Sequence, residues 1–481
     1  MRKKSNRSQK KRRYILIAFI LSFILLGVYV SFLLSGFFGE SKLQNSPRSN
    51  KLISAEPIIV IGGPSHVTSL PFPGKAFVYS ADNGNFLWDV SEEVADSGFG
   101  ISVSASDFNG DSYQDIVVGA HGHQEPGSIN NKGKIYVYSG APPHNLLWSK
   151  KGFIAGNNLP PSLYNQYPEK YVEFGKGISS IPDTNGDGFE DILVEDPSYS
   201  PGGGILPGNH SHPPDSSGRV NLYSGIDGRL LWFGVGPNET HAYATDSSGI
   251  PDLNGDGFGD FVISGFGADN HRGKIYVYSG APPHNLLWSK TGESVGDRFG
   301  YSVDGISDLD GDGFGDIVVN AANFNSIRGK VYVYSGNTGV LLWSYLGDTG
   351  VSSDGTVSGV HDLDGDGYSD IVVGEPYFST LSNNWVGRIQ VLSGNTGTLL
   401  WSENGLSYPE NFGRFLSSVI GSNGRGKMII SSPQYIHNGM SLAGRVKVYS
   451  GDAAGGNLRW TYEGTHDGEL FGRSVSGAPR Y

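Results

Sequence analysis

Residues 308–316 read Asp-Leu-Asp-Gly-Asp-Gly-Phe-Gly-Asp, and the apolar run Ile317-Val318-Val319 follows directly. Carboxylates stand at the first, third, fifth and ninth positions of this stretch, with glycines between them. A hard cation of the size of Ca²⁺ takes about six to eight oxygen ligands, which closely spaced carboxylates and a backbone carbonyl can supply. Glycine allows the tight fold that this requires, because it adopts positive φ angles at little steric cost. The stretch therefore predicts a calcium-binding loop.

The loop differs from an EF-hand, which needs a bidentate Glu at its twelfth position and a helix on each side. The twelfth residue here is Val319, and it lies inside a β-branched run that is typical of a strand. We therefore predict a hairpin in which the calcium loop joins two strands.

The same spacing occurs five times in the chain. One copy alone is compatible with a plain acidic turn, but five copies with one spacing favour metal binding, and we expect about five Ca²⁺ ions. The predicted ligands, with the seventh residue of each loop contributing its backbone carbonyl, are Asp107, Asn109, Asp111, Tyr113, Asp115, Asp183, Asn185, Asp187, Phe189, Asp191, Asp252, Asn254, Asp256, Phe258, Asp260, Asp308, Asp310, Asp312, Phe314, Asp316, Asp362, Asp364, Asp366, Tyr368 and Asp370.

The N-terminus carries a basic segment and an apolar segment. Residues 1–13 hold eight Lys and Arg residues and no acid, and residues 14–38 form an uncharged, largely apolar run. About 20 apolar residues suffice to cross a bilayer as a helix, and a basic flank tends to stay in the cytoplasm. We predict a cytoplasmic tail (1–13), a single transmembrane signal-anchor helix (14–38) and a stalk (39–55), with the rest outside the cytoplasm at the cell surface or in the periplasm. A cleaved signal peptide is the alternative.

Composition excludes several classes of function. The chain has no cysteine, which excludes thiol catalysis, Fe–S clusters, zinc–thiolate sites and disulfides. The formal charge of −12 becomes −20 once the eight basic residues of the N-terminal tail are set aside. Such a surface repels nucleic acid, so no nucleic-acid partner is expected.

The remaining chain, residues 56–481, is a repeat array whose units each contain four strand-like segments. The second unit shows them at residues 99–103, 115–120, 133–140 and 146–148, and residues 133–150 are identical to 273–290. Repeats of this length indicate a solenoid, a propeller or a similar array.

The two ends of the array complete one another. The first unit begins with only the second to fourth segments, at residues 58–64, 74–80 and 86–88, and the chain ends with a lone first segment at 471–475. One C-terminal strand pairing with the N-terminal blade would close a ring, as β-propellers do to protect their sheet edges. We predict an all-β fold, a seven-bladed β-propeller of four-stranded blades, preceded by the transmembrane helix.

The Phe-Gly openings, the acidic loops and the Gly-Ala-Pro-like strand ends resemble the FG-GAP repeat family, which includes the N-terminal β-propeller of integrin α subunits. The resemblance covers residues 56–481. It implies that the calcium loops lie on the lower face of the propeller and that the upper face, which integrins use for ligand, carries the connections between strands two and three and between blades. Blade seven has Gly421–Lys427 in place of an acidic loop, and blade one lacks the loop, so we expect no metal there.

The strand-four repeat, such as residues 335–343, also resembles that of quinoprotein (PQQ) dehydrogenases. That alternative implies eight blades and a cofactor pocket, whereas the count here is seven. We interpret the tryptophans of this repeat as blade-packing residues. The sequence contains no catalytic constellation separable from the calcium loops, so an enzyme is not expected.

Two long connections are the candidate ligand site. Residues 152–173 contain Tyr164, Tyr167 and Tyr171, and residues 198–217 contain His210 and His212. Tyrosines on loops of a rigid scaffold are typical of recognition surfaces. The His-x-His spacing could bind zinc, but no third ligand is obvious, and a surface loop is the simpler interpretation.

Together these features predict a membrane-anchored, extracytoplasmic, calcium-binding propeller that acts in cell adhesion or partner recognition, with an extracellular protein or glycan as ligand. A carbohydrate-binding (lectin-like) or carbohydrate-active propeller is the second hypothesis, and a purely structural envelope component is the third.

Overall fold

The computed structural model describes residues 56–65, 74–92, 94, 97–124, 133–152, 173–199, 217–236, 243–348, 354–380, 385–452 and 455–477. Within these residues no helix is long and apolar enough to span a membrane, and the predicted anchor, residues 14–38, lies outside them. The described chain from residue 56 onward belongs to one compact unit.

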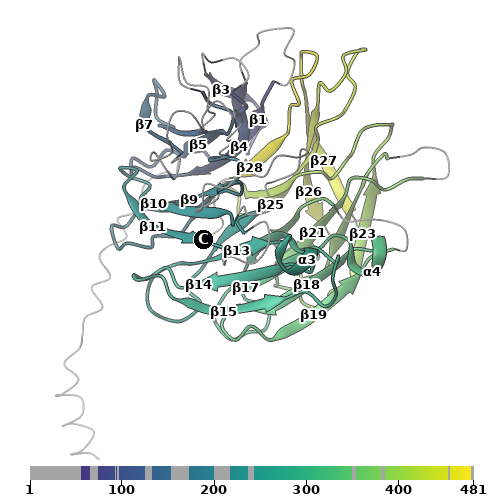
Figure 1. Ribbon diagram of the computed structural model, residues 1–481. Coiled ribbons are helices and arrows are strands. Elements are labelled where there is room, and N and C mark those ends of the chain that lie inside the picture. The colour runs from purple at the N-terminus through teal and green to yellow at the C-terminus, as the bar shows by residue number, and fades with distance from the viewer. Residues whose placement is uncertain are drawn as a thin grey trace, which may run out of the picture. The chain divides into compact units, whose positions relative to one another are not determined.

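Seven four-stranded antiparallel sheets make up this unit, so the predicted seven-bladed propeller is confirmed. Figure 1 shows the sheets around a common centre, with the colour of the chain running once round from purple to yellow. From the innermost strand outward, blade 1 consists of β28 (Ser474–Gly477), β1 (Ile58–Gly63), β2 (Lys75–Ser80) and β3 (Phe86–Ser91), and blade 2 of β4 (Phe99–Ser106), β5 (Asp115–Ala120), β6 (Lys134–Tyr138) and β7 (Leu146–Lys151). Blade 3 consists of β8 (Ile178–Ile181), β9 (Asp191–Asp196), β10 (Arg219–Tyr223) and β11 (Leu230–Val235), and blade 4 of β12 (Ser247–Ile250), β13 (Asp260–Gly265), β14 (Lys274–Tyr278) and β15 (Leu286–Thr291).

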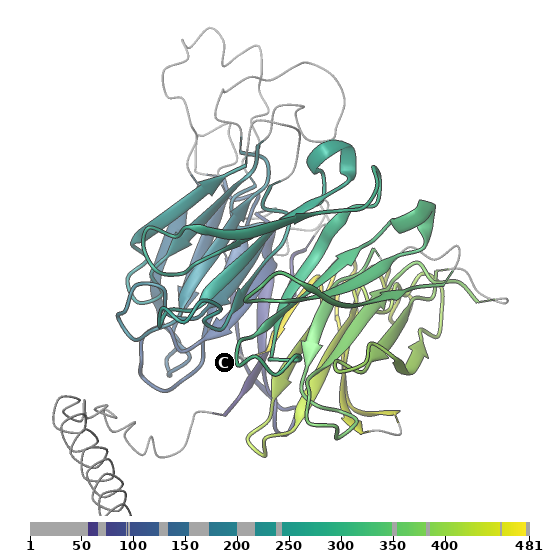
Figure 2. The same ribbon diagram turned by 90° about the horizontal axis from the view of Figure 1, so that it is seen from below.

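The second half of the ring repeats the pattern. Blade 5 consists of β16 (Phe299–Ile306), β17 (Asp316–Ala321), β18 (Lys330–Ser335) and β19 (Leu341–Leu346), and blade 6 of β20 (Val357–Val360), β21 (Asp370–Glu375), β22 (Arg388–Leu392) and β23 (Leu399–Asn404). Blade 7 consists of β24 (Leu416–Ile420), β25 (Gly426–Ser432), β26 (Arg445–Asp452) and β27 (Gly455–Glu463). Two short helices, α3 (Ala268–His271) and α4 (Phe324–Ile327), follow the second strands of blades 4 and 5 (teal and green in Figure 2).

Burial follows the position of each strand in its blade. The second strands, such as Ile58–Gly63 and Asp115–Ala120, are buried throughout, because neighbouring blades cover both of their faces. Their nearly continuous β-branched runs are what a strand buried on both faces requires. The fourth strands, such as Phe86–Ser91, alternate between exposed and half-buried residues at the rim. The core is therefore a set of seven clusters distributed around the ring.

The ring closes where its two ends meet. Strand β28 pairs antiparallel with β1, with Val60 opposite Ser476, and Figure 1 shows yellow β28 beside purple β1. The pairing segment is Ser474–Gly477, whereas the sequence predicted 471–475. Phe471 forms a bridge with Gly444 at the joint between blades 7 and 1. The N–H groups of Gly472 and Arg473 both donate to Gly62 O, at 2.9 and 3.2 Å, so the chain reaches β1 just before the paired segment.

The strand-four tryptophans hold neighbouring blades together. The Nε1–H groups of Trp148, Trp288 and Trp343 donate hydrogen bonds to the carbonyl oxygens of Gly225, Gly336 and Gly394 at 2.8, 2.7 and 2.8 Å, and each glycine belongs to the next blade. The predicted packing role is thus observed. With seven blades rather than eight, the fold differs from what the quinoprotein alternative implied.

Candidate functional site

The five acidic loops connect the first two strands of blades 2 to 6 and share one hydrogen-bond pattern. In the loop of blade 5, Asp308 accepts hydrogen bonds from the backbone N–H groups of Gly311 at 2.7 Å and Gly313 at 2.8 Å. The equivalent aspartates of the other four loops, Asp107, Asp183, Asp252 and Asp362, accept from the residues three and five positions further on in the same way. The shared spacing of the acidic residues therefore gives the five loops the same hydrogen-bond geometry.

The ninth residue of each loop is a buried aspartate that ties the loop to the rest of its blade. Asp316 accepts from the N–H groups of Leu309 at 2.7 Å and Gly336 at 3.0 Å. Burial, together with the nearby carboxylates of Asp310 and Asp308, raises its pKa to about 7. The ninth aspartates of the other loops show the same effect, with pKa values of about 7 or 6.

Carboxylate oxygens converge in two of the loops. Among the described residues, Asp308, Asp310 and Asp316 place one oxygen each within 4.8 Å of one another, and so do Asp362, Asp364 and Asp370. The first three loops have Asn at the third position, as Asn109, Asn185 and Asn254. A set of hard oxygen donors at this spacing, without a basic partner in the loop, fits a calcium ion.

Residues that the sequence analysis did not single out complete these loops. The backbone N–H groups of Gly140, Gly225, Gly280, Gly336 and Gly394 each donate to the ninth aspartate of their own blade. Three of these glycines also accept the tryptophan hydrogen bond from the preceding blade. The recurring Gly after strand three was a visible signal for this role. These three glycines link a loop to the packing between two blades.

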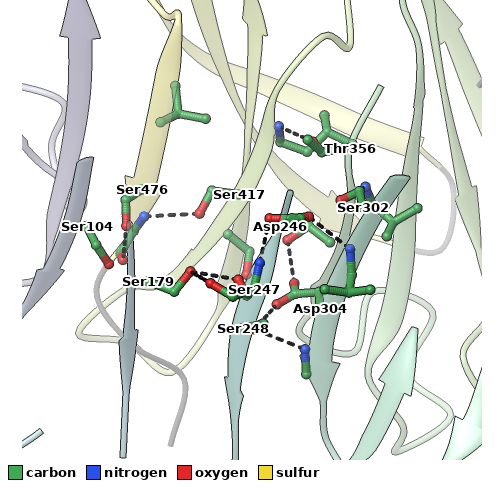
Figure 3. A pocket seen from close by; sticks show the side chains of 18 of the residues that line it. Ser104, Ser179, Asp246, Ser247, Ser248, Ser302, Asp304, Thr356, Ser417 and Ser476 are labelled. Carbon is green, nitrogen blue, oxygen red and sulfur yellow. Dashed lines mark hydrogen bonds between the residues drawn. The ribbon is translucent and has the colours of Figure 1, made fainter. Parts of the chain in front are cut away.

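The innermost strands surround a central channel lined by small polar side chains (Figure 3). The cavity is about 220 Å³ in volume. One lining residue from every blade pairs with the third residue of the adjacent second strand, so the seven occupy equivalent positions. We call them the channel ring: Ser104, Ser179, Ser248, Asp304, Ser358, Ser418 and Ser476.

Asp304 is the one carboxylate in the channel ring, and it ties three blades together. It accepts hydrogen bonds from Ser248 Oγ at 2.9 Å and Ser358 Oγ at 3.1 Å, and also from the N–H of Gly359 at 3.0 Å. Elsewhere in the channel Gly477 N–H donates to Ser417 Oγ at 3.1 Å (Figure 3). The channel ring therefore forms polar contacts between neighbouring blades.

Two further carboxylates lie beside the channel in blades 3 and 4. Asp246 accepts from the N–H of Val303 at 2.9 Å, and buried Glu195 accepts from Ser247 Oγ at 2.8 Å. Burial is the largest cause that raises the pKa of both groups, and the charge of Asp246 raises that of Glu195 further. Gly177 makes room for Glu195, because a Cβ at Gly177 would lie 1.9 Å from a carboxylate oxygen of Glu195.

This arrangement predicts a pH dependence of stability. The folded-state pKa of Glu195 is raised, so its favourable contribution is present below the unfolded pKa, near 4.5, and is lost as pH rises through the higher folded value. Relative to the native chain, Glu195→Gln should gain at least about 1 kcal/mol in free energy of unfolding between pH 5 and pH 8. Denaturant unfolding at a series of pH values measures this. Glu293→Gln is the control, because the hydrogen bond from Lys330 lowers the pKa of Glu293 below 4.5. Its contribution is then constant between pH 5 and pH 8, and its curve should run parallel to that of the native chain. Parallel curves for the native chain and Glu195→Gln would contradict the prediction.

The predicted ligand residues Tyr164, Tyr167, Tyr171, His210 and His212 lie outside the described residues. The ends of the two connections that carry them belong to the upper face, where strands two and three of a blade are joined and where one blade leads to the next. The five acidic loops lie at the opposite ends of the strands. The described ends of these two connections and the acidic loops therefore belong to different faces.

Comparison with known proteins agrees with this geometry. The FG-GAP repeat family matches residues 99–138, 299–334 and 355–392, in blades 2, 5 and 6. Integrin alpha-5 of Xenopus laevis is 28% identical over 255 residues, covering 50% of this chain and 22% of that protein. Integrin alpha pat-2 of Caenorhabditis briggsae is 26% identical over 266 residues (52% and 19%), and integrin alpha-8 of Mus musculus is 28% identical over 252 residues (50% and 20%).

The chain thus contains FG-GAP repeats, and its resemblance to the integrin α propeller is confirmed. It spans about a fifth of the length of these relatives. Two solved structures also align. BBS1N in complex with ARL6DN has a TM-score of 0.46 and 10% sequence identity, and the alignment covers 77% of this chain and 89% of that one. Rhamnogalacturonan lyase YesW has a TM-score of 0.39 and 14% sequence identity, and the alignment covers 86% of this chain and 71% of that one.

Proposed function

We propose that this chain is a calcium-stabilised recognition propeller, held at a membrane and directed outside the cytoplasm, whose upper face binds a protein or glycan ligand. The observation that carries this proposal is the difference between the two faces. The lower face repeats one loop geometry in five blades, whereas the upper connections differ in length from blade to blade. A rigid scaffold with variable loops is typical of a recognition module. The integrin α relatives support adhesion or recognition at the family level rather than catalysis.

Calcium would be held by the carboxylates at positions one, three, five and nine of each loop, with Asn at position three in three of them and a backbone carbonyl at position seven. A bound ion supplies positive charge that offsets the mutual repulsion of these carboxylates. The ninth aspartate accepts from a glycine N–H, and in blades 3, 5 and 6 the same glycine accepts from the tryptophan of the preceding blade. The chain's own contacts thus connect these three loops to the joints between blades.

The recognition function is tested with the full chain in mild detergent, screened against arrays of extracellular proteins and of glycans in the presence of Ca²⁺ and again with EGTA. We expect binding that requires Ca²⁺. Binding to glycans alone would favour the lectin-like alternative, and release of a product from a bound glycan would favour a carbohydrate-active one. If the chain binds to neither array, the proposal is wrong.

Membrane anchoring leads to a separate prediction. The chain should resist alkaline carbonate extraction from membranes and keep its full mass of 51.5 kDa, because an uncleaved apolar helix stays in the bilayer. A variant without residues 1–38 is the control and should be found in the soluble fraction. Mass spectrometry of the mature chain decides the outcome, since a cleaved signal peptide would leave a shorter chain that is released.

A further inference from the structure

Three exposed aromatic side chains stand together on the upper face of blade 6. Tyr377 and Trp385 belong to the connection between β21 and β22, and Tyr408 belongs to the connection from β23 to β24. Their exposed fractions are 37%, 50% and 57%. The ring centroids of Tyr377 and Trp385 are 6.2 Å apart, and those of Trp385 and Tyr408 are 6.1 Å apart. We call these three residues the aromatic platform. Most large aromatic side chains of a folded chain are largely covered, so such a group needs an explanation.

Buried polar contacts fix the loops that carry the aromatic platform. Glu410 is fully buried, pairs with Arg445, and accepts hydrogen bonds from the N–H groups of Leu406 at 2.6 Å and Ser407 at 3.3 Å. The two loops are also joined to each other, since Phe412 N–H donates to Val386 O at 3.2 Å. The aromatic platform is therefore arranged before any ligand arrives, which lowers the entropic cost of binding.

Arg414 contacts the aromatic platform, and a second arginine, Arg473, lies beside Arg414. Arg414 donates to Tyr377 Oη at 3.4 Å and to the backbone carbonyl of Asp354 at 2.7 Å. The guanidinium groups of Arg414 and Arg473 lie 5.6 and 4.7 Å from the centre of the same Phe415 ring. Among the described ion pairs, the carboxylate of Asp354 faces Arg298 at 3.8 Å, and neither Arg414 nor Arg473 pairs with a carboxylate.

The two guanidinium groups are close enough to repel each other. Burial, together with the charge of Arg414, lowers the pKa of Arg473 to about 10. A carboxylate placed between the two would relieve this repulsion, and arginine is the residue best suited to bind a carboxylate with two hydrogen bonds. The surface therefore combines apolar contact area with a local excess of positive charge, although the chain as a whole is acidic.

We propose that the aromatic platform, together with Arg414 and Arg473, binds an acidic segment of a partner protein that also carries an apolar side chain. The inference rests on the proposed recognition function and names the class of ligand. Trp, Tyr and Arg are the residues enriched at the energetic centres of protein–protein interfaces. Leu406, 72% exposed in the same loop as Tyr408, adds an aliphatic contact that suits a protein side chain better than a sugar.

The test uses the full chain in mild detergent with Ca²⁺ and an array of short synthetic peptides. Each peptide with apolar residues is made in three matched versions, with Asp and Glu, with Asn and Gln, and with Lys. We expect the acidic versions to bind and the amide versions to bind at least about tenfold more weakly. Added salt should weaken the binding of the acidic versions, because it screens exposed charges.

Variants locate the site. Trp385→Asn removes the central ring, and Asn tolerates the positive φ of 47° at this position. Arg414→Gln removes one charge. Each should weaken binding of the acidic peptides at least about tenfold. Phe233→Ala is the matched control, because Phe233 is 51% exposed and lies 4.5 Å from the Arg219 guanidinium on the outer strand of blade 3. The control should bind as the native chain does, and melting curves confirm that all variants fold.

The outcomes separate this inference from the proposed function. If the Trp385→Asn and Arg414→Gln variants bind array proteins or peptides as well as the native chain does, the inference is wrong while the recognition function stands. Equal binding of acidic and amide peptides also overturns it. Binding that depends on Trp385 but is found on a glycan array alone would mean that the aromatic platform binds a carbohydrate. It would overturn the proposal that the ligand is an acidic protein segment. If the native chain binds no peptide, protein or glycan in Ca²⁺, both proposals fail.

Discussion

Removing calcium is expected to lower the melting temperature of the propeller by about 10–20 °C. An ion that binds only the folded state at 100 times its dissociation constant stabilises by about 2.7 kcal/mol, and about five sites would add several times that amount. The buried ninth aspartates, whose pKa values lie near 7 or 6 without an ion, show how costly these groups are to keep charged. Calorimetry of the full chain with Ca²⁺ and then with EGTA measures the shift, and a calcium titration gives the stoichiometry, expected to be about five.

Two substitutions in the loop of blade 5 form a matched pair for this prediction. Asp308→Asn changes the first position, which is Asp in all five loops, and should lower the stoichiometry by one ion. Asp310→Asn changes the third position, where Asn109, Asn185 and Asn254 stand in other loops, and should leave the stoichiometry unchanged. An unchanged melting temperature after chelation would mean that the loops are plain acidic turns and would remove the calcium part of the proposed function.

The blade count and the loops could be read from the sequence because each depends on local spacing. The acidic loop fixes its own hydrogen bonds, the β-branched runs mark buried second strands, and the three N-terminal segments need the C-terminal one to complete a blade. The register of closure was less predictable. Phe471 opens its repeat as Phe99 and Phe299 do. Those two residues pair with Ala120 and Ala321 in their blades, whereas the pairing of blade 1 starts at Ser474.

Features that arise from residues far apart in sequence could not be predicted. The aromatic platform brings together two connections whose rings have no periodic relation, and the pair Arg414 and Arg473 forms only when the ring closes. The channel ring is regular in space but hard to recognise in the sequence. The Phe-Gly pair that would align the first strands of the blades is replaced by Tyr243-Ala244 in blade 4 and by Ser353-Asp354 in blade 6. In each case the missing information was the arrangement of blades around the axis.

The joint between blades leads to the second large effect, which is expected from Gly273→Ala. Gly273 has a φ of +86° and forms a bridge with Phe299, the first residue of the next blade. A Cβ at this position would lie 1.9 Å from the carbonyl oxygen of Phe299 and 2.6 Å from its nitrogen, and both are backbone atoms that cannot turn aside. We expect a loss of about 3–5 kcal/mol in free energy of unfolding, since the blades must separate to admit the methyl group.

Gly296→Ala is the control that isolates the contact from the backbone conformation. Gly296 has a φ of +89°, nearly the same as that of Gly273, but no atom lies within 4 Å of a Cβ built there. Its replacement should therefore cost only the left-handed strain, about 1–2 kcal/mol. Denaturant unfolding of both variants in Ca²⁺ measures the difference. If the two variants lose equal stability, glycine is required at the start of strand three only because of the positive φ angle. A larger loss for Gly273→Ala would mean that the close approach of two blades requires glycine here. The same reasoning extends to Gly387 and Gly444, because a Cβ added at these positions would meet backbone atoms of Phe412 and Phe471.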